Sequence, residues 1–207
     1  MTNVSEIEGK IKTLGLNCNN DTIVAYCGRV ENLIFTIKHF NQEMHSIKND
    51  VCLSSDILIL TRVMVEYIAV MTIGLTDILS CLLNDAFLLP GKGNIYLSTI
   101  IKELQTYKGG QITLAQGICD KIKEILDMGE WDYMHALDNY AKHNGIVKSI
   151  PILYHDEKKG DIFKYCVDEF IYKNKKYSTK SIDEFIDISD ALVIKINSII
   201  QYIMEYK

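Results

Sequence analysis

The sequence predicts a mainly α-helical protein, a helical bundle with a small antiparallel β-meander inserted before its C-terminal helix. Only 2 of the 207 residues are proline, and because proline costs about 3 kcal/mol inside a helix, long uninterrupted helices are favoured. Apolar residues recur at steps of three and four over most of the chain, which is the spacing of one helix face. Between residues 146 and 180 this pattern changes to short β-branched and aromatic runs separated by polar turns, which predicts strands.

Length and composition predict a single domain over residues 1–207, with residues 146–180 as a β insertion within it. Hydrophobic residues make up 48% of the chain and the net charge is only -5, a combination that excludes intrinsic disorder. Charged side chains interrupt the most apolar stretch, residues 51–90, and its longest uncharged piece, Tyr67 to Thr76, is too short to cross a bilayer. The N-terminus lacks the pattern of a signal peptide, so we expect a cytoplasmic protein without a membrane segment.

The first half of the chain is predicted to form three helices. Residues 3–16 form a short amphipathic helix with Ser5 as its N-cap. Residues 21–49 keep helical spacing of apolar residues, and Asp21 is placed to cap that helix. The third helix covers residues 54–83 and is apolar nearly all round, which is typical of a helix buried on several sides.

Three shorter helices are predicted next, over residues 95–107, 112–128 and 131–144. Gly145 follows the last of them, at the position where a helix often ends in a residue with positive φ.

The β insertion and the last helix complete the predicted fold. Strands are expected at residues 147–154, 162–172 and 175–178, and Pro151 favours an edge position for the first strand because proline cannot donate a ladder hydrogen bond. The segment Ser181-Ile182-Asp183-Glu184 matches a capping box, with Ser181 as N-cap, and predicts a helix that runs to the C-terminus.

One segment, residues 131–145, combines polar, aromatic and imidazole side chains. Asn139 and His143 are four residues apart and therefore share a helix face, on which His135 lies one turn earlier. Burial of Asn and His is costly unless they are hydrogen-bonded, so we expect this stripe to face a ligand, a partner or solvent. The two histidines are about 12 Å apart along the helix axis, too far to share a metal ion. None of the six cysteines forms a C-x-x-C pair, so neither a metal site nor a cofactor is predicted.

The order of long helices, followed by Asn-Tyr-Ala-Lys-His-Asn-Gly at the end of a helix, resembles the HEPN superfamily of prokaryotic all-α proteins. Members of this superfamily are typically dimers, and many are ribonucleases of toxin–antitoxin or phage-defence systems. Their active motif has an Arg, a polar residue that is often Asn, a few variable residues and a His. The resemblance places Asn139 at the polar position and His143 at the catalytic His. Its Arg position falls on Asp138, which reverses the charge.

The substitution at the Arg position decides which function we expect. In such a site His143 would act as general acid–base on RNA, while a cation would stabilise the charge on the phosphate. Asp138 would repel that phosphate, and Lys142 lies about 100° round the helix from His143. Arg62, which forms an i,i+4 pair with Glu66 on the third helix, is the remaining candidate cation or a surface ion pair.

We therefore expect a homodimeric, catalytically degenerate binding module, in a bacterial defence or toxin–antitoxin context. Its ligand would be a nucleotide, an RNA end or a protein partner. The expected binding residues are Asn139, His143, His135, Asp138, Lys142 and Arg62. Two alternatives stay open. One is a metal-independent ribonuclease that uses His143 with a cation from another helix or subunit, and the other is a purely structural or interaction protein.

Overall fold

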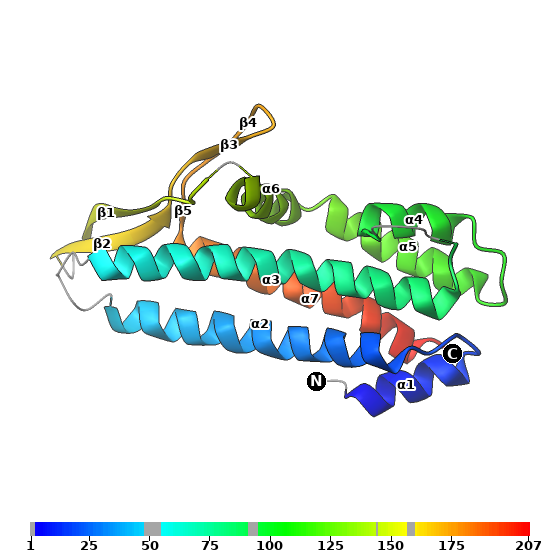
Figure 1. Ribbon diagram of the computed structural model, residues 1–207. Coiled ribbons are helices and arrows are strands. Elements are labelled where there is room, and N and C mark those ends of the chain that lie inside the picture. Colours follow the sequence, from blue (N-terminus) through cyan, green and yellow to red (C-terminus); the bar gives the residue numbers. More distant parts are fainter. Residues whose placement is uncertain (1–2, 48–54, 91–94, 144, 157–159) are drawn as a thin grey trace. The chain divides into compact units, whose positions relative to one another are not determined.

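The computed structural model describes residues 3–47, 55–90, 95–143, 145–156 and 160–207. Within these ranges the chain is mainly helical, with a small antiparallel sheet before its last helix (Figure 1), which confirms the predicted fold class. The helices are α1 (Val4–Thr13), α2 (Asn20–Ile47), α3 (Ser55–Phe87), α4 (Leu97–Gln105), α5 (Ile112–Leu126), α6 (Gly129–His143) and α7 (Ile182–Glu205). The strands are β1 (Ser149–Asp156), β2 (Gly160–Val167), β3 (Phe170–Tyr172), β4 (Lys175–Tyr177) and β5 (Lys180–Ser181).

The chain divides into two compact units, and four helices (α2, α3, α6 and α7) contribute residues to both. The first unit contains Met1–Asn32, Ile73–Trp131 and Leu192–Lys207, and the second contains Leu33–Thr72 and Asp132–Ala191. The expected single domain over residues 1–207 stays a prediction.

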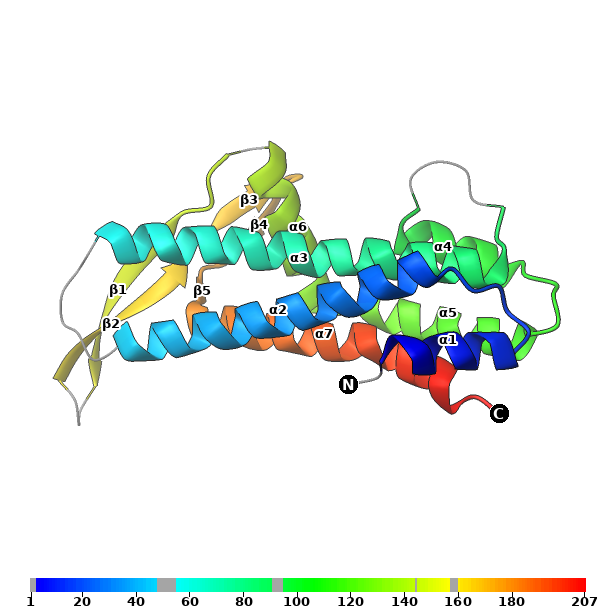
Figure 2. The same ribbon diagram turned by 60° about the horizontal axis from the view of Figure 1, so that its bottom comes forward.

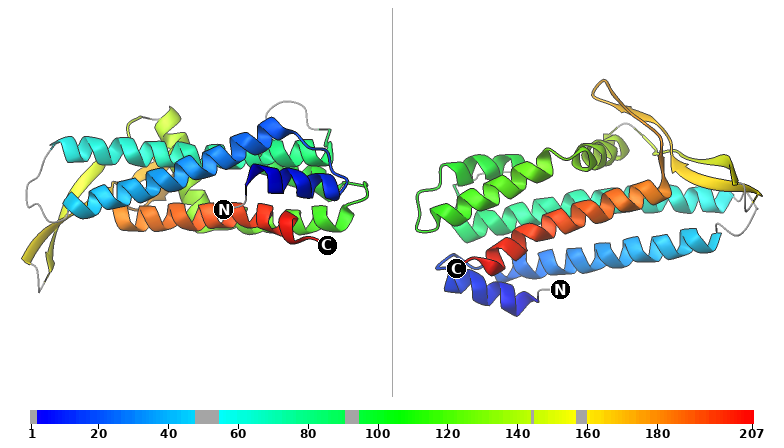
Figure 3. Two further views of the ribbon diagram at one scale, coloured as in Figure 1. Left: turned by 90° about the horizontal axis from the view of Figure 1, so that it is seen from below. Right: turned by 180° about the vertical axis from the view of Figure 1, so that it is seen from behind.

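The first unit holds both ends of the described chain. Helix α1 lies alongside the C-terminal part of α7 (Figures 2 and 3), where the Lys10 ammonium donates to the Tyr206 carbonyl at 2.5 Å. Tyr26 of α2 is buried and donates its hydroxyl to Oδ1 of Asn197 on α7, at 2.7 Å. The core of this unit is formed by buried aliphatic side chains from every helix, among them Ile7, Leu79, Leu83, Ile118, Ile122 and Ile199.

The second unit contains all the strands. Strands β1 and β2 form an antiparallel hairpin in which Ser149 pairs with Val167, and β5 adds to the far side of β2. Strand β1 is therefore an edge strand, as Pro151 indicates. The predicted strand over residues 162–172 is wrong in one respect. It is two strands, because the chain leaves β2 after Val167 and pairs β3 with β4 in a separate two-stranded sheet (Figure 1).

The helix caps agree with the sequence at α7 and differ at α1 and α2. At α7 the Ser181 N–H donates to the Glu184 carboxylate at 2.8 Å and the Glu184 N–H donates to Oγ of Ser181, which confirms the capping box. At α1 the N-cap is Asn3 and not Ser5, since Oδ1 of Asn3 accepts the N–H of Glu6. Helix α2 begins one residue earlier than predicted, and Asn19 accepts the N–H of Asp21, which lies in the first turn.

Helix α3 is the one helix in the described ranges that is long and apolar enough to cross a membrane by length and composition alone. Within its most apolar window, 39% of the residues are buried inside the protein, so the helix is only partly enclosed by the described chain. This burial is consistent with a soluble protein. The expected cytoplasmic location stays a prediction.

Candidate functional site

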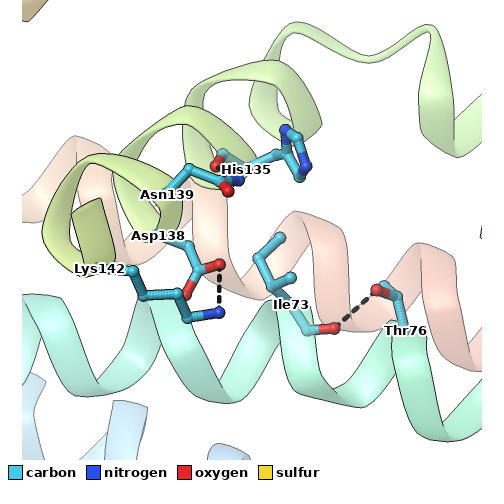
Figure 4. A network of polar contacts seen from close by, with 6 residues as sticks. All are labelled: Ile73, Thr76, His135, Asp138, Asn139 and Lys142. Carbon is cyan, nitrogen blue, oxygen red and sulfur yellow. Dashed lines mark hydrogen bonds and ion pairs between the residues drawn. The ribbon is translucent and has the colours of Figure 1, made fainter. Parts of the chain in front are cut away.

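Helix α6 carries five of the six predicted site residues. Four of them are drawn in Figure 4, where His135 and Asn139 lie on one side of the helix and Asp138 and Lys142 on another. His135 and His143 are exposed, and Asn139 is half-buried between them. Asp138 is buried with the apolar side of the helix, beside Leu137. The polar stripe that the spacing predicts is therefore present, but Asp138 is not part of it.

The amide of Asn139 is bonded within its own helix. Its Nδ2 donates to the carbonyl oxygen of His135, four residues earlier, at 2.7 Å (Figure 4). The His135 side chain contacts water, but neighbouring protein atoms partly desolvate its imidazole, and this desolvation lowers its pKa below the ordinary value of 6.5. The nearby Asp138 carboxylate acts in the opposite direction. At neutral pH His135 is therefore mainly an uncharged ring and supplies no fixed cation to this face.

Asp138 and Lys142 form an ion pair. Nζ of Lys142 lies 2.7 Å from Oδ2 of Asp138, which is only 1% exposed (Figure 4). Oδ1 of Asp138 is buried and has no hydrogen-bond partner in the described part of the chain. The ion pair neutralises Asp138, which would otherwise repel a phosphate. It also occupies Lys142, the cation that is nearest to His143 in the sequence.

His143 ends helix α6 with an exposed imidazole. In the part of the chain that the structure describes, no hydrogen bond or ion pair reaches its ring. The arrangement that the ribonuclease alternative needs, a cation next to this imidazole, is not formed by the described residues.

Arg62 belongs to a different feature of the second unit. It is half-buried on α3 and makes no ion pair or hydrogen bond with any described residue. The predicted pair with Glu66 does not form among the described residues, and Oε1 of Glu66 accepts the backbone N–H of Val147 at 3.1 Å. Arg62 lines a hollow of about 250 Å³ between the first turns of α3 and the start of β1.

The sequence did not predict an exposed apolar face on α3. Five large apolar side chains of α3 are between 38% and 51% exposed. They are Ile59, Leu60, Val63, Tyr67 and Val70, and we call them the α3 stripe. The expectation of burial on several sides is therefore wrong for this side of the helix. The spacing does show that these five side chains share one face, since they lie within about 100° of the helix circumference. A face that packs against the core has the same spacing, so the sequence alone does not distinguish an exposed apolar face from a buried one.

The thiols and acids of the described residues give no sign of a metal centre. Cys18, Cys27, Cys81, Cys119 and Cys166 are free thiols. No group of three or more His, Cys, Asp or Glu within the described ranges is placed to hold a metal ion.

Comparisons with known proteins add no assignment. No protein-family model, curated protein or solved structure matches this chain. The resemblance to the HEPN superfamily stays a prediction.

Proposed function

We propose that this chain is a non-catalytic binding module that forms a homodimer through the α3 stripe. The observation that supports this most directly is the exposure of five large apolar side chains on one helix face. Single exposed apolar residues are common on protein surfaces, but a contiguous apolar patch is typical of an interaction site.

The stripe has the pattern of a helix–helix contact. Ile59, Val63, Tyr67 and Val70 follow one another at steps of four, four and three residues, the spacing of a face that packs against another helix. Between residues 57 and 72 no charged side chain falls inside this face, and Glu66 lies at its edge. Water contacts this apolar surface in the isolated chain, so covering it is favourable by about 25 cal/mol for each Å² buried.

A second copy of the chain fits this face because the stripe is self-complementary. In a two-fold symmetric dimer the same patch occurs on both sides, and residue i meets residue j while j meets i. Two antiparallel α3 helices that cross near residue 65 place Ile59 opposite Val70 and Val63 opposite Tyr67. Every contact along the centre of that interface is then apolar.

Binding is favoured over catalysis because the ribonuclease site expected around His143 lacks a cation among the described residues. The amide of Asn139 donates to its own helix, Lys142 is paired with Asp138, and no described cation contacts His143. An imidazole alone lacks the charge stabilisation that phosphoryl chemistry needs. The HEPN-like ancestry of the module and its role in bacterial defence remain part of this proposal.

Sedimentation equilibrium of the full chain tests the homodimer. We expect the wild-type chain to have the mass of a dimer at micromolar concentration and the variants Val63→Asp and Tyr67→Asp to be monomers, because each places two unpaired charges in an apolar interface. Val24→Asp on α2 is the matched control, since Val24 is 51% exposed and Val63 is 48% exposed. This control is expected to remain a dimer.

Two results would overturn the proposal: a wild-type monomer throughout the concentration range, or stripe variants that dimerise like the wild type. Co-sedimentation of a monomeric wild type with anionic lipid vesicles would also overturn it and would assign the α3 stripe to a lipid surface instead. Far-UV circular dichroism of each variant confirms that it is folded.

A further inference from the structure

The hollow beside Arg62 lies next to the α3 stripe and has a chemistry of its own. It is formed where the start of β1 lies beside the first turns of α3 (Figure 2), and both segments belong to the second unit. Ile59 belongs to both features, because it lines the hollow and is one of the five residues of the stripe.

The polar part of this hollow carries positive charge. Arg62 and Lys148 both line it, and neither makes an ion pair with a described residue. The nearest acid along α3 is Glu66, one turn from Arg62, and one of its oxygens accepts the N–H of Val147. Glu66 does not line the hollow, and the charged residues that do, Arg62 and Lys148, are both cations.

An unused hydrogen-bonding group lies in the same wall. Ser149 lines the hollow, and its Oγ is buried without a hydrogen-bond partner in the described part of the chain. A buried hydroxyl without a partner is costly, because it has lost its hydrogen bonds to water and gained none in exchange. Because this Oγ has no surface open to the hollow in the present conformation, it reaches a ligand there only after the Ser149 side chain rotates. A ligand that accepts a hydrogen bond would then supply the missing partner.

The remaining walls are apolar. Leu58, Ile59, Ile146 and Ile150 contribute them, and Ile146 is 62% exposed. A hollow of about 250 Å³ is slightly smaller than the usual pocket for a drug-sized ligand, which starts near 300 Å³. It therefore suits a small ligand, or the end of a larger one, with one anionic group and a short apolar part.

We propose that this hollow binds an organic carboxylate, with its oxygens on the Arg62 guanidinium and its apolar tail against Ile59 and Ile146. The planar guanidinium offers two parallel N–H donors, which match the two oxygens of a carboxylate. Lys148 adds charge attraction, and the hydroxyl of Ser149 donates a further hydrogen bond once its side chain rotates toward the hollow. The carboxylate can belong to a free aliphatic acid or to the C-terminus of a peptide with apolar last residues. This inference goes beyond the homodimer, and the two share the Ile59 side chain, which lies at the border of the hollow and the α3 stripe.

Isothermal titration of the full chain with octanoate tests the proposal, and octanamide is the matched neutral probe. We expect saturable octanoate binding that weakens as salt is added, and binding of octanamide that is weaker by about tenfold or more. Arg62→Gln is expected to weaken octanoate binding by a similar factor, Arg62→Lys by less, and Ser149→Ala by about threefold to tenfold. Arg29→Gln changes the only other arginine of the chain and is expected to bind octanoate like the wild type.

A peptide that ends in Leu-Leu with a free carboxylate, compared with its C-terminal amide, separates the two sources of the anion. If the free peptide binds more tightly than octanoate, the C-terminus of a protein is the ligand, and if octanoate binds more tightly, a free acid is. Equal binding of octanoate and octanamide, full octanoate affinity in Arg62→Gln, or no saturable binding of any probe would overturn the proposal. The sedimentation mass is measured on the same samples, so a failure of the homodimer is distinguished from a failure of this site.

Discussion

Nζ of Lys142 lies 2.7 Å from Oδ2 of Asp138, one turn apart on helix α6. The carboxylate side chain is 2% exposed, whereas the lysine side chain is 46% exposed, so the lysine reaches inward from solvent to a buried acid. This contact explains how the chain accommodates an acid on the buried side of α6. The acid is part of the interior and is neutralised there.

Removal of the lysine is expected to destabilise the protein. Lys142→Met leaves the buried Asp138 carboxylate unpaired, and we expect the free energy of unfolding in urea to fall by about 2 kcal/mol. Lys123→Met is the control, because Lys123 and Asp120 form an exposed pair whose loss costs less than about 0.5 kcal/mol. The double variant Asp138→Leu/Lys142→Met is expected to recover most of the loss. Equal effects of Lys142→Met and Lys123→Met would show that the Asp138 pair contributes no more than a surface contact.

The wild-type chain is expected to leave single-stranded RNA intact in the presence of EDTA, and His143→Ala is expected to behave identically. The reason is that no described cation contacts the His143 imidazole, so charge on the phosphate has no stabilising partner. Gel analysis of a labelled RNA measures this. Cleavage by the wild type that disappears in His143→Ala would instead establish the ribonuclease alternative.

Two buried tyrosines are expected to respond in opposite ways to loss of the hydroxyl. Tyr133 is 5% exposed and its hydroxyl has no hydrogen-bond partner among the described residues, whereas Tyr26 donates to Asn197. Burial raises the pKa of both phenols. We expect Tyr133→Phe to leave the unfolding free energy unchanged or raise it by about 1 kcal/mol, and Tyr26→Phe to lower it by about 1–2 kcal/mol. Thermal and urea unfolding measure both, and a loss in Tyr133→Phe as large as that in Tyr26→Phe would contradict the difference.

The capping box of α7 is expected to make stability depend on pH. Hydrogen bonds from the Ser181 backbone and then from its side chain lower the pKa of Glu184 below its ordinary value of 4.5. A lowered pKa in the folded state stabilises the protein above pH 4.5, and this stabilisation is lost as the pH falls through the folded pKa. Ser181→Ala should therefore cost about 1 kcal/mol at neutral pH, and less at acidic pH.

Ser198→Ala in the same helix is the control for this experiment. The Ser198 hydroxyl donates to the carbonyl of Lys195 within α7, and it makes no hydrogen bond to an acid among the described residues. Its effect on urea unfolding is expected to be small and independent of pH. A loss in Ser181→Ala that stays constant down to pH 3, about 1.5 units below the ordinary pKa, would show that the Glu184 charge is not involved.

Local sequence rules predicted the helices because they depend on neighbouring residues alone. The capping box at Ser181 is correct since both of its hydrogen bonds lie within one turn. The N-caps of α1 and α2 were misplaced because Asn3 and Asn19 compete with nearby Ser5 and Asp21 for the same role, and the entry path of the backbone decides between them. The strand over residues 162–172 was predicted as one because its division after Val167 depends on pairing partners.

Gly117 shows how a helix far away in the sequence can require a glycine at one position. It lies inside helix α5, where glycine is unfavourable, and nothing near it in sequence explains it. In the folded chain a Cβ at this position would overlap the hydroxyl and ring of Tyr202 on α7. The glycine leaves the space that this tyrosine occupies.

The sequence by itself determined the helical class, the place of the β segment and the face on which His135, Asn139 and His143 lie, because periodicity and capping act over a single turn or strand. Only the tertiary structure decided that Asp138 points inward to meet Lys142, that Arg62 lies near the start of β1 without an ion pair to any described residue, and that the α3 stripe remains in contact with water. Helical spacing gives the direction in which a side chain points around the axis of its helix. What that side chain meets is set by the packing of elements far apart in the chain.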